Sequence, residues 1–386
     1  MNERPSTRAW LLIVLLIVSS APRAASITVG VGGQAATLSD AVRQARDGDT
    51  ILVHGGEYRG DVAVLHQRQL TIRGVGRRPV LIADGKHAEG KAILVVRDGD
   101  IRIENLEFRG ARVPDGNGAG IRFEKGKLTV RGCAFFDNEV GLLTANFDNA
   151  ELIVEDSEFA QAPRVGGRLH HLLYVGRIAS LQVSGSRFHD GHTGHLLKSR
   201  ASRTTLTYNL LLDGTGGGAS YEVDLPNGGD ALLLGNVIGQ SASTKNPVVV
   251  AYGAEGKAWP QNRLRLAHNT LISEGIGPAW FLRVWKDRLP PGTQVQAVNN
   301  LSVGLGVFAL GASGAFRGNF PVTRHMLVDI DTLAFALKEA SPLRGAGVDS
   351  RRAFGTDLSP KAEFALPVGT TPLQTRDKWT PGAFQR

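Results

Sequence analysis

The chain has 386 residues, of which 44 are Lys or Arg and 36 are Asp or Glu, so its formal net charge is +8. A positive net charge favours acidic partners through long-range attraction. The basic residues are scattered without interleaved aromatic residues, which argues against nucleic acid and favours an anionic polysaccharide or the cell surface. Cys133 is the only cysteine, so no internal disulfide can stabilise the fold.

The N-terminal segment is typical of a secretory signal. An apolar run over residues 9–18 follows Arg4 and Arg8 and precedes small residues at 24–26. This run is too short to span a membrane. We therefore expect a signal peptide over residues 1–26 and a secreted or periplasmic protein with no transmembrane segment after cleavage. An uncleaved N-terminal anchor is the alternative.

A short helix is predicted at the start of the exported chain. In "ATLSDAVRQARDGDTILVHGGEYRG" the residues Leu38, Ala41, Val42 and Ala45 form an apolar helical stripe, and a strand over residues 50–53 follows. This stretch resembles the beginning of right-handed parallel β-helix proteins of the pectate-lyase-like superfamily. The resemblance implies that the helix caps the open end of the hydrophobic stack.

From residue 101 onward one phrase recurs: a short alternating strand, a small or polar residue, a variable residue and a bulky apolar residue. The spacing of the phrase lies mostly in the twenties, which is typical of a parallel β-solenoid. We therefore predict an all-β chain with a single-stranded parallel β-helix over residues 27–312. The aligned apolar residues are Phe108, Phe135, Phe159, Phe188, Leu211, Ile238, Leu271 and Leu301.

The position two residues before each aligned apolar residue predicts an internal ladder. Small and polar residues there would hydrogen-bond along the axis and satisfy the backbone at an inward bend. The column reads Leu106, Cys133, Ser157, Ser186, Asn209, Asn236, Asn269 and Asn299. Because Cys133 belongs to this column, we interpret it as a packed core residue rather than a nucleophile. Residues 313–386 lack the repeat and are expected to form an irregular C-terminal capping tail.

Each coil also carries a second strand, and three neighbouring coils place charged and polar residues on it. Adjacent strands lie about 4.8 Å apart, so three coils make a patch about 10 Å deep, which suits one or two sugar rings. The patch contains His171, Tyr174, His195, Lys198, Arg200, Glu222, Asp224 and Asn227, with His192 and Arg203 in flanking turns. A purely structural alternative is that these cations and carboxylates form cross-strand salt bridges.

Two of these coils are similar to the chondroitinase B and alginate lyase group of polysaccharide lyases. Lys198-Ser199 matches the Lys-Ser pair of that group, and Gly235-Asn236 matches a later Gly-Asn phrase. The resemblance implies that Lys198 removes the proton alpha to a uronate carboxylate. The sequence departs from the group at His195, where the group has acidic calcium ligands, and at residues 224–228, where it has Arg-His-Gly.

β-Elimination at a uronate needs a base, an acid and a cation that neutralises the carboxylate. In our interpretation Lys198 is the base, with its pKa lowered by neighbouring arginines. Arg200, Arg203 or a protonated histidine would bind the carboxylate, and Tyr174 or His171 would be the acid. The remaining candidates for substrate binding are His192, Asn227, Tyr252 and Glu255, and His195 is grouped with the catalytic residues.

Other interpretations of the same patch stay open. Glu222 and Asp224 stand at i and i+2, so on one strand face they would serve as the carboxylate pair of a glycoside hydrolase or, with Asn227, as a calcium site. No other cofactor is indicated. A non-catalytic module that binds polysaccharide or the cell surface would use the same basic face. Nothing in the sequence indicates an oligomer, so we expect a monomer.

Overall fold

The computed structural model describes residues 1, 24–164, 168–351, 355–374 and 377–385. The predicted signal peptide lies almost wholly outside these described residues. Across the described part of the chain, no helix is long and apolar enough to cross a membrane.

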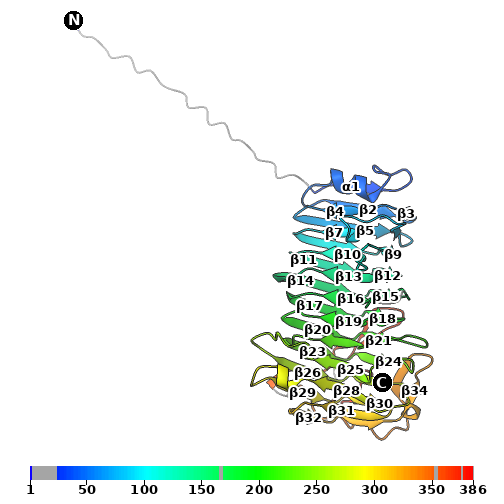
Figure 1. Cartoon of the computed structure of the whole chain (residues 1–386), viewed down its shortest axis with the longest axis vertical. Coiled ribbons are helices and arrows are strands. Elements are labelled where there is room, and N and C mark those ends of the chain that lie inside the picture. Colours follow the sequence, from blue (N-terminus) through cyan, green and yellow to red (C-terminus); the bar gives the residue numbers. More distant parts are fainter. Residues whose placement is uncertain (2–23, 165–167, 352–354, 375–376, 386) are drawn as a thin grey trace.

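Three parallel sheets of twelve, eleven and ten strands wind through the described residues as about 10 stacked turns (Figure 1). Sheet A contains β1 (Ser26–Val29), β2 (Thr50–His54), β5 (Gln69–Val75), β8 (Asp100–Glu104), β11 (Lys127–Arg131), β14 (Phe147–Glu155), β17 (Ile178–Ser184), β20 (Arg203–Thr207), β23 (Asp230–Leu234), β26 (Arg263–Ala267), β29 (Gln294–Val298) and β32 (Ala315–Arg317). Sheet B contains β3 (Glu57–Arg59), β6 (Val80–Ile82), β9 (Glu107–Arg109), β12 (Ala134–Phe136), β15 (Glu158–Ala160), β18 (Arg187–Phe188), β21 (Leu210–Leu212), β24 (Val237–Gln240), β27 (Thr270–Ser273), β30 (Leu301–Val303) and β33 (Phe320–Val322). Sheet C contains β4 (Ala63–Leu65), β7 (Ala92–Val96), β10 (Ala119–Phe123), β13 (Val140–Thr144), β16 (Leu173–Val175), β19 (Leu197–Ser199), β22 (Val223–Leu225), β25 (Val248–Tyr252), β28 (Ala279–Val284) and β31 (Gly306–Leu310).

Alternation along each strand supplies the core, as the repeat predicts. In β8, Ile101 and Ile103 are buried while Asp100 and Arg102 are exposed. On sheet B the predicted column of aligned residues is confirmed as a stack of rings, with centroid separations of 5.1, 4.5 and 4.7 Å in the series Phe108, Phe135, Phe159 and Phe188. Stacked short strands therefore share one continuous interior that no single coil could form.

The predicted polar ladder is present, with one correction. Asn209 donates to the Oδ1 of Asn236 at 2.9 Å, and Asn236 donates to the Oδ1 of Asn269 at 3.0 Å. The next rung is Asn300, which accepts from the Asn269 side chain at 2.9 Å, and not the predicted Asn299. The column of aligned apolar residues shifts by one residue at the same coil. Leu271 pairs with Ser302, and the predicted Leu301 pairs with Thr270 instead.

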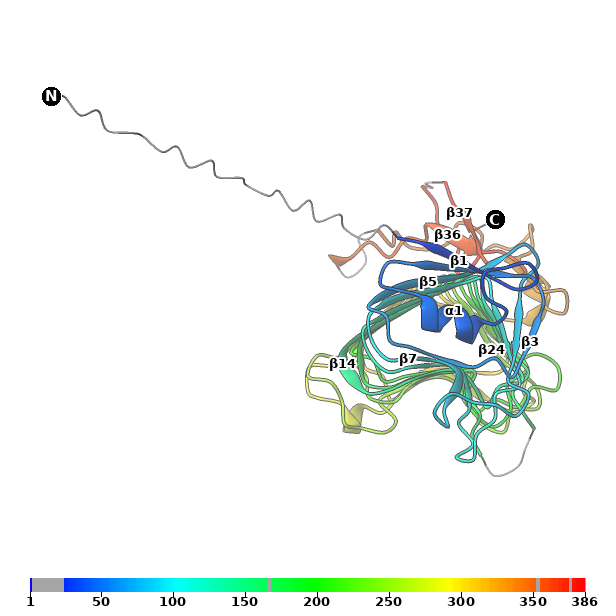
Figure 2. The same ribbon diagram turned by 90° about the horizontal axis from the view of Figure 1, so that it is seen from above.

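The cap helix α1 (Leu38–Gln44) closes the N-terminal end, as predicted, and Figure 2 shows it over the interior of the coil. Leu38, Ala41 and Val42 face the core. The Thr37 side chain accepts from the Asp40 N–H, and Asp61 from the first coil accepts from the Leu38 N–H at 2.6 Å. These contacts satisfy amides that the first helical turn leaves without intrahelical partners.

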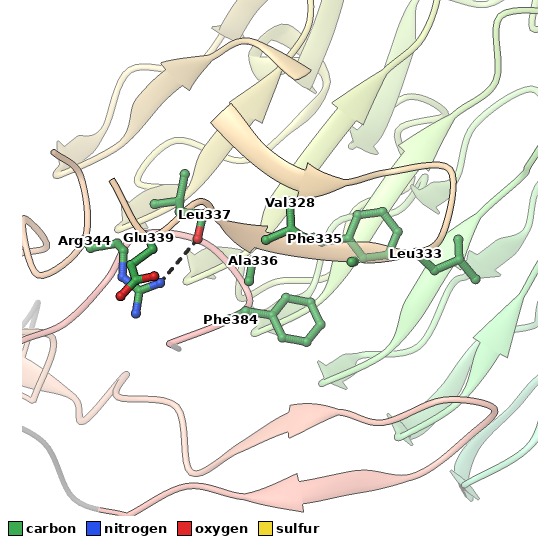
Figure 3. Close-up of a pocket in the computed structure, with 9 residues that line it drawn as sticks. Val328, Leu333, Phe335, Ala336, Leu337, Glu339, Arg344 and Phe384 are labelled. Carbon is green, nitrogen blue, oxygen red and sulfur yellow. Dashed lines mark hydrogen bonds between the residues drawn. The ribbon is translucent and has the colours of Figure 1, made fainter. Parts of the chain in front are cut away.

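The C-terminal tail begins later in the chain than the predicted boundary at residue 312. The parallel coil continues through β33, past residue 312. The remaining elements are the turns η1 (Lys286–Arg288) and η2 (Arg324–Met326) and the antiparallel pairs β34 (Leu327–Asp329) with β35 (Ala334–Leu337) and β36 (Ala362–Phe364) with β37 (Thr370–Pro372). The tail packs Phe335, Phe364 and Phe384 on the outer side of sheet B, against Leu210 and Val237. A hollow of about 470 Å³ remains between β34–β35 and Phe384 (Figure 3).

Candidate functional site

The charged residues converge on the outer side of sheet C. Tyr174, Lys198, Asp224, Ala251 and Arg283 occupy one register row across β16, β19, β22, β25 and β28. Their strand neighbours, such as Leu197, Val223 and Val250, are fully buried in the core. Alternation therefore turns the row outward.

Lys198 and Arg200 share one carboxylate, that of Glu255. Lys198 Nζ lies 2.6 Å from Glu255 Oε1, and Arg200 Nη2 lies 2.6 Å from Glu255 Oε2. Glu255 comes from the loop after β25, and its side chain is 43% exposed while those of Lys198 and Arg200 are 9% and 19% exposed. Glu255, predicted as a substrate-binding residue, thus bridges the two cations.

The rest of the cluster fixes the two cations. Asp224 Oδ2 lies 3.0 Å from Lys198 Nζ. Arg200 donates to Asn227 Oδ1 at 2.9 Å and to the Tyr174 hydroxyl at 3.2 Å. The structure therefore places four of the predicted residues, Tyr174, Asp224, Asn227 and Glu255, around Arg200 and Lys198. The cations are ion-paired, as the structural interpretation anticipated, but Glu255 is the bridging partner.

Burial and pairing set the charge states of this cluster. Burial lowers the pKa of Lys198, but the carboxylates of Asp224 and Glu255 outweigh burial, so that pKa is raised overall. Burial raises the pKa of Asp224 to about 6 despite Lys198. Glu255 is the opposite case: burial raises its pKa, but hydrogen bonds from Lys198 and Arg200 lower it overall. The expected lowering of the Lys198 pKa by arginines is therefore wrong for this arrangement.

His171, His195 and Tyr221 form a ring stack beside the row. The centroids are 4.8 Å apart between His171 and His195, and 4.9 Å between His195 and Tyr221. Each histidine Nδ1 accepts a backbone N–H, from His195 at 2.9 Å and from Tyr221 at 3.1 Å. Burial lowers the pKa of His171 to about 3 and of His195 to about 2, so both rings are neutral. Neither histidine can supply the positive charge that we assigned to a carboxylate clamp.

His195 still contacts the cluster. Its Nε2 lies 3.4 Å from Asp224 Oδ2. Because Nδ1 accepts from a backbone amide, the ring proton sits on Nε2 and points toward that carboxylate. His195 is thus a positioning residue for Asp224.

Three predicted substrate-binding residues lie elsewhere. Tyr252 is fully buried and donates to the Gly229 carbonyl at 2.6 Å. Arg203 is exposed on sheet A, in register with Asp230. His192 lines a hollow of about 790 Å³ formed with Arg164, Lys245 and loop glycines, which shares no residue with the Lys198 cluster.

Glu222 is the clearest correction. It is fully buried, at the register position of Leu196 and Val249, both core residues. Neither of its carboxyl oxygens has a hydrogen-bond partner among the described residues. Burial raises its pKa well above the ordinary range, and the Asp213 carboxyl raises it further, which favours the protonated form. It cannot pair with Asp224, which lies on the outer face.

The residues do not fit calcium either. Calcium takes six to eight oxygen ligands. No group of three or more His, Cys, Asp or Glu side chains placed to hold a metal ion occurs in the described ranges. The two carboxylates that remain near Lys198, those of Asp224 and Glu255, already pair with cations.

The site also contains residues that sequence reasoning missed. The Trp259 indole N–H donates to the Arg200 carbonyl at 3.0 Å, and the Arg177 guanidinium stacks 3.8 Å from the Trp259 ring. A groove of about 560 Å³ adjoins His171 and Tyr174 and reaches Arg122. Arg122 was detectable, because it occupies the outward position of the strand two coils before Tyr174. The Trp259 loop carries no such periodic signal.

No protein-family model matches the chain. Among solved structures it is similar to the crystal structure of pectate lyase Pel9A, with a TM-score of 0.67, 13% identity, and 95% of this chain and 98% of that chain covered. An alginate lyase from Paenibacillus sp. str. FPU-7 matches with a TM-score of 0.44, 14% identity and coverage of 76% and 97%. A mutant of the PL6 family alginate lyase AlyGC matches with a TM-score of 0.34, 14% identity and coverage of 77% and 53%. The first likeness shows the fold alone, a parallel β-helix, as predicted.

Proposed function

We propose that the protein is an exported polysaccharide lyase that cleaves a uronate-containing chain by β-elimination. The observation that carries the proposal is the binding of one carboxylate by Lys198 and Arg200 together on the outer face of sheet C. A uronate sugar carries the same group, a carboxylate, and would present it to this outer face of sheet C. The likeness in fold to a protein named as a pectate lyase supports this substrate class.

The substrate carboxylate would replace Glu255 on Arg200. Arg200 is oriented for this by Asn227 and Tyr174, and a guanidinium binds a carboxylate through two parallel hydrogen bonds. This contact neutralises the charge that grows when the proton alpha to the carboxylate is removed. When Glu255 is displaced, Lys198 also loses one of its two anionic partners.

Lys198 would then act as the base and Tyr174 as the acid. The Lys198 amine takes the alpha proton, and the electron pair of that C–H bond forms a carbon–carbon double bond. The glycosidic C–O bond to the leaving sugar breaks, and the Tyr174 hydroxyl gives its proton to the departing oxygen. Because the pKa of Lys198 is raised, its neutral form grows with pH, and we expect the rate to rise into the alkaline range.

Glycoside hydrolysis is the second candidate, and one observation favours it. Asp224 and Glu255 both contact Lys198, and their pKa values are shifted in opposite directions. Two carboxyl groups with separated pKa values are the usual acid and base of a glycosidase. In that reaction Asp224 would be the proton donor and Glu255 the base or nucleophile.

The experiment is a panel of acidic and neutral polysaccharides with two readouts. A lyase produces an unsaturated uronate that absorbs in the ultraviolet, and new reducing ends appear in equal number. A hydrolase produces reducing ends without that absorbance. Binding of acidic chains that weakens with salt but yields neither product would leave only a non-catalytic polysaccharide-binding protein. Equal binding of neutral and acidic chains at low salt would remove the electrostatic basis of all three functions, the lyase, the hydrolase and the non-catalytic binding protein.

A further inference from the structure

A second cation lies on the same outward row as Lys198. Arg283 in β28 follows Asp224 and Ala251 in register, so it stands three strands beyond Lys198. Its strand neighbours Leu282 and Val284 are core residues, which confirms that Arg283 faces outward. At about 4.8 Å for each step, the two backbone positions are about 14 Å apart along the axis.

The setting of Arg283 is unlike that of the other cations on this row. Its guanidinium carbon lies 5.2 Å from the Trp280 ring centroid and 5.3 Å from that of Trp285. Lys198, by contrast, is ion-paired with Asp224 at 3.0 Å, and Arg122 is ion-paired with Glu124 at 3.3 Å. Among the described residues no ion pair joins Arg283 to a carboxylate, and its Nε is buried without a hydrogen-bond partner.

The aromatic residues connect this cation to the candidate active site. The Trp285 ring lies 6.4 Å from that of Tyr221, which ends the stack of His171 and His195. Trp280, Arg283 and Trp285 are all partly exposed. A guanidinium that contacts two indoles presents N–H donors beside flat apolar rings, which suits the carboxylate and the ring of an acidic sugar.

We infer that Arg283, Trp280 and Trp285 form a second carboxylate subsite for the same polyanionic chain. This inference rests on the proposed function for the nature of the chain. The substrate would run along the axis of sheet C, with one acidic sugar at Lys198 and Arg200 and another, about three sugar units away, at Arg283. The protein would therefore recognise oligomers and polymers of uronic acids rather than single sugars.

The test measures binding as a function of chain length. A Lys198→Ala background prevents turnover by the proposed base while Arg200 still binds carboxylate. In that background, Arg283→Ala should weaken binding of an oligogalacturonate of about six units by about tenfold or more and leave binding of single galacturonate unchanged. Trp fluorescence or calorimetry reports both affinities. Arg203→Ala, an equal loss of charge on sheet A, should change neither affinity.

Arg283→Lys separates binding from folding. It keeps the charge, so it should recover part of the affinity for the long chain, and thermal unfolding shows whether each variant is folded. Equal weakening of long and short ligands, or no weakening of the long one, would overturn the inference. The binding test measures no product, so its outcome is independent of the polysaccharide panel. Length-dependent binding, together with a wild-type protein that forms no unsaturated product in the panel, would refute the lyase reaction and keep the subsite. Lyase activity together with binding that is independent of Arg283 would keep the lyase reaction and refute the subsite.

Discussion

The inner and outer sides of sheet C use the same strands for opposite purposes. On β22, Val223 belongs to the core and Asp224 pairs with Lys198 on the outside. The outer carboxylates are matched by cations, whereas the inner carboxyl of Glu222 has no partner among the residues described. Polar groups on the outer side can exchange partners with a ligand. A polar group on the inner side can only change stability.

A bend before the strand explains why neighbouring residues divide in this way. Strict alternation would send Glu222 and Asp224 to one face. β22 begins at Val223, however, and Glu222 lies in a bend before it, in the column of Leu172 and Leu196. Two successive residues therefore face the core at this corner.

The largest effect is expected from Lys198, on the outer side. Lys198→Ala should reduce turnover by about 10²-fold or more, because a general base typically contributes that much. Lys198→Arg should be nearly as inactive, because arginine stays protonated. Steady-state rates on the substrate that the panel identifies measure both, and Arg203→Ala is the control. If Lys198→Arg keeps its activity, proton abstraction falls to another group and the Asp224–Glu255 pair becomes the candidate.

Glu222, on the inner side, should change stability and leave activity intact. Its pKa is raised by burial, so the folded protein keeps a proton that the unfolded chain loses. Stability should therefore fall as pH rises from the ordinary glutamate range through the raised pKa. Glu222→Leu restores the column of Leu196, removes an unpaired buried group, and should add about 1–3 kcal/mol to the free energy of unfolding.

Denaturant unfolding at several pH values measures this effect. The gain should be larger at alkaline pH, where the wild-type carboxyl ionises. Glu151→Leu, at an exposed position of β14, is the control and should give no comparable gain. A loss of activity in Glu222→Leu with unchanged stability would show that the inner carboxyl serves the site, and the division between the two sides would be wrong.

A smaller effect is expected at Glu255, whose carboxylate can be exchanged for that of the substrate. Glu255→Gln removes a carboxylate from Lys198, so the pKa of Lys198 should fall and the rise of rate with pH should move to lower pH. Binding of galacturonate should tighten, because Arg200 no longer has a competing partner. Glu57→Gln, on β3 of the first coil, is the control. Abolition of all cleavage by Glu255→Gln, with binding retained, would favour hydrolysis.

The fold was predictable because its signal is periodic. Phe108, Phe135, Phe159 and Phe188 recur at positions where stacking requires them, and no distant contact is needed to find them. The error at Asn299 arises where the periodic signal is ambiguous, since Asn299 and Asn300 are adjacent and either fits the spacing. The position of the tail along sheet B was not predictable, because the tail has no repeat to fix it.

The site was predictable only in part. Lys198, Arg200, Tyr174 and Asp224 share a sheet face, which register alone predicts. The bridging role of Glu255 depends on a loop that returns 57 residues after Lys198, and no local pattern indicates that contact. Charge states are also non-local, because the pKa of Lys198 depends on which carboxylates the fold brings to it.

The smallest effect is expected from metal removal, and it tests whether the outer face neutralises its carboxylates with its own cations. Asp224 and Glu255 are already paired with Lys198 and Arg200, and a calcium ion at that place would face two cations. We therefore expect a chelator to leave activity and the thermal midpoint unchanged, and added calcium to change neither. Activity assays and thermal unfolding with and without chelator measure this. A loss of activity that calcium restores would mean that Asp224 and Glu255 leave their cations to bind the metal, and Lys198 would then lose both carboxylates that raise its pKa.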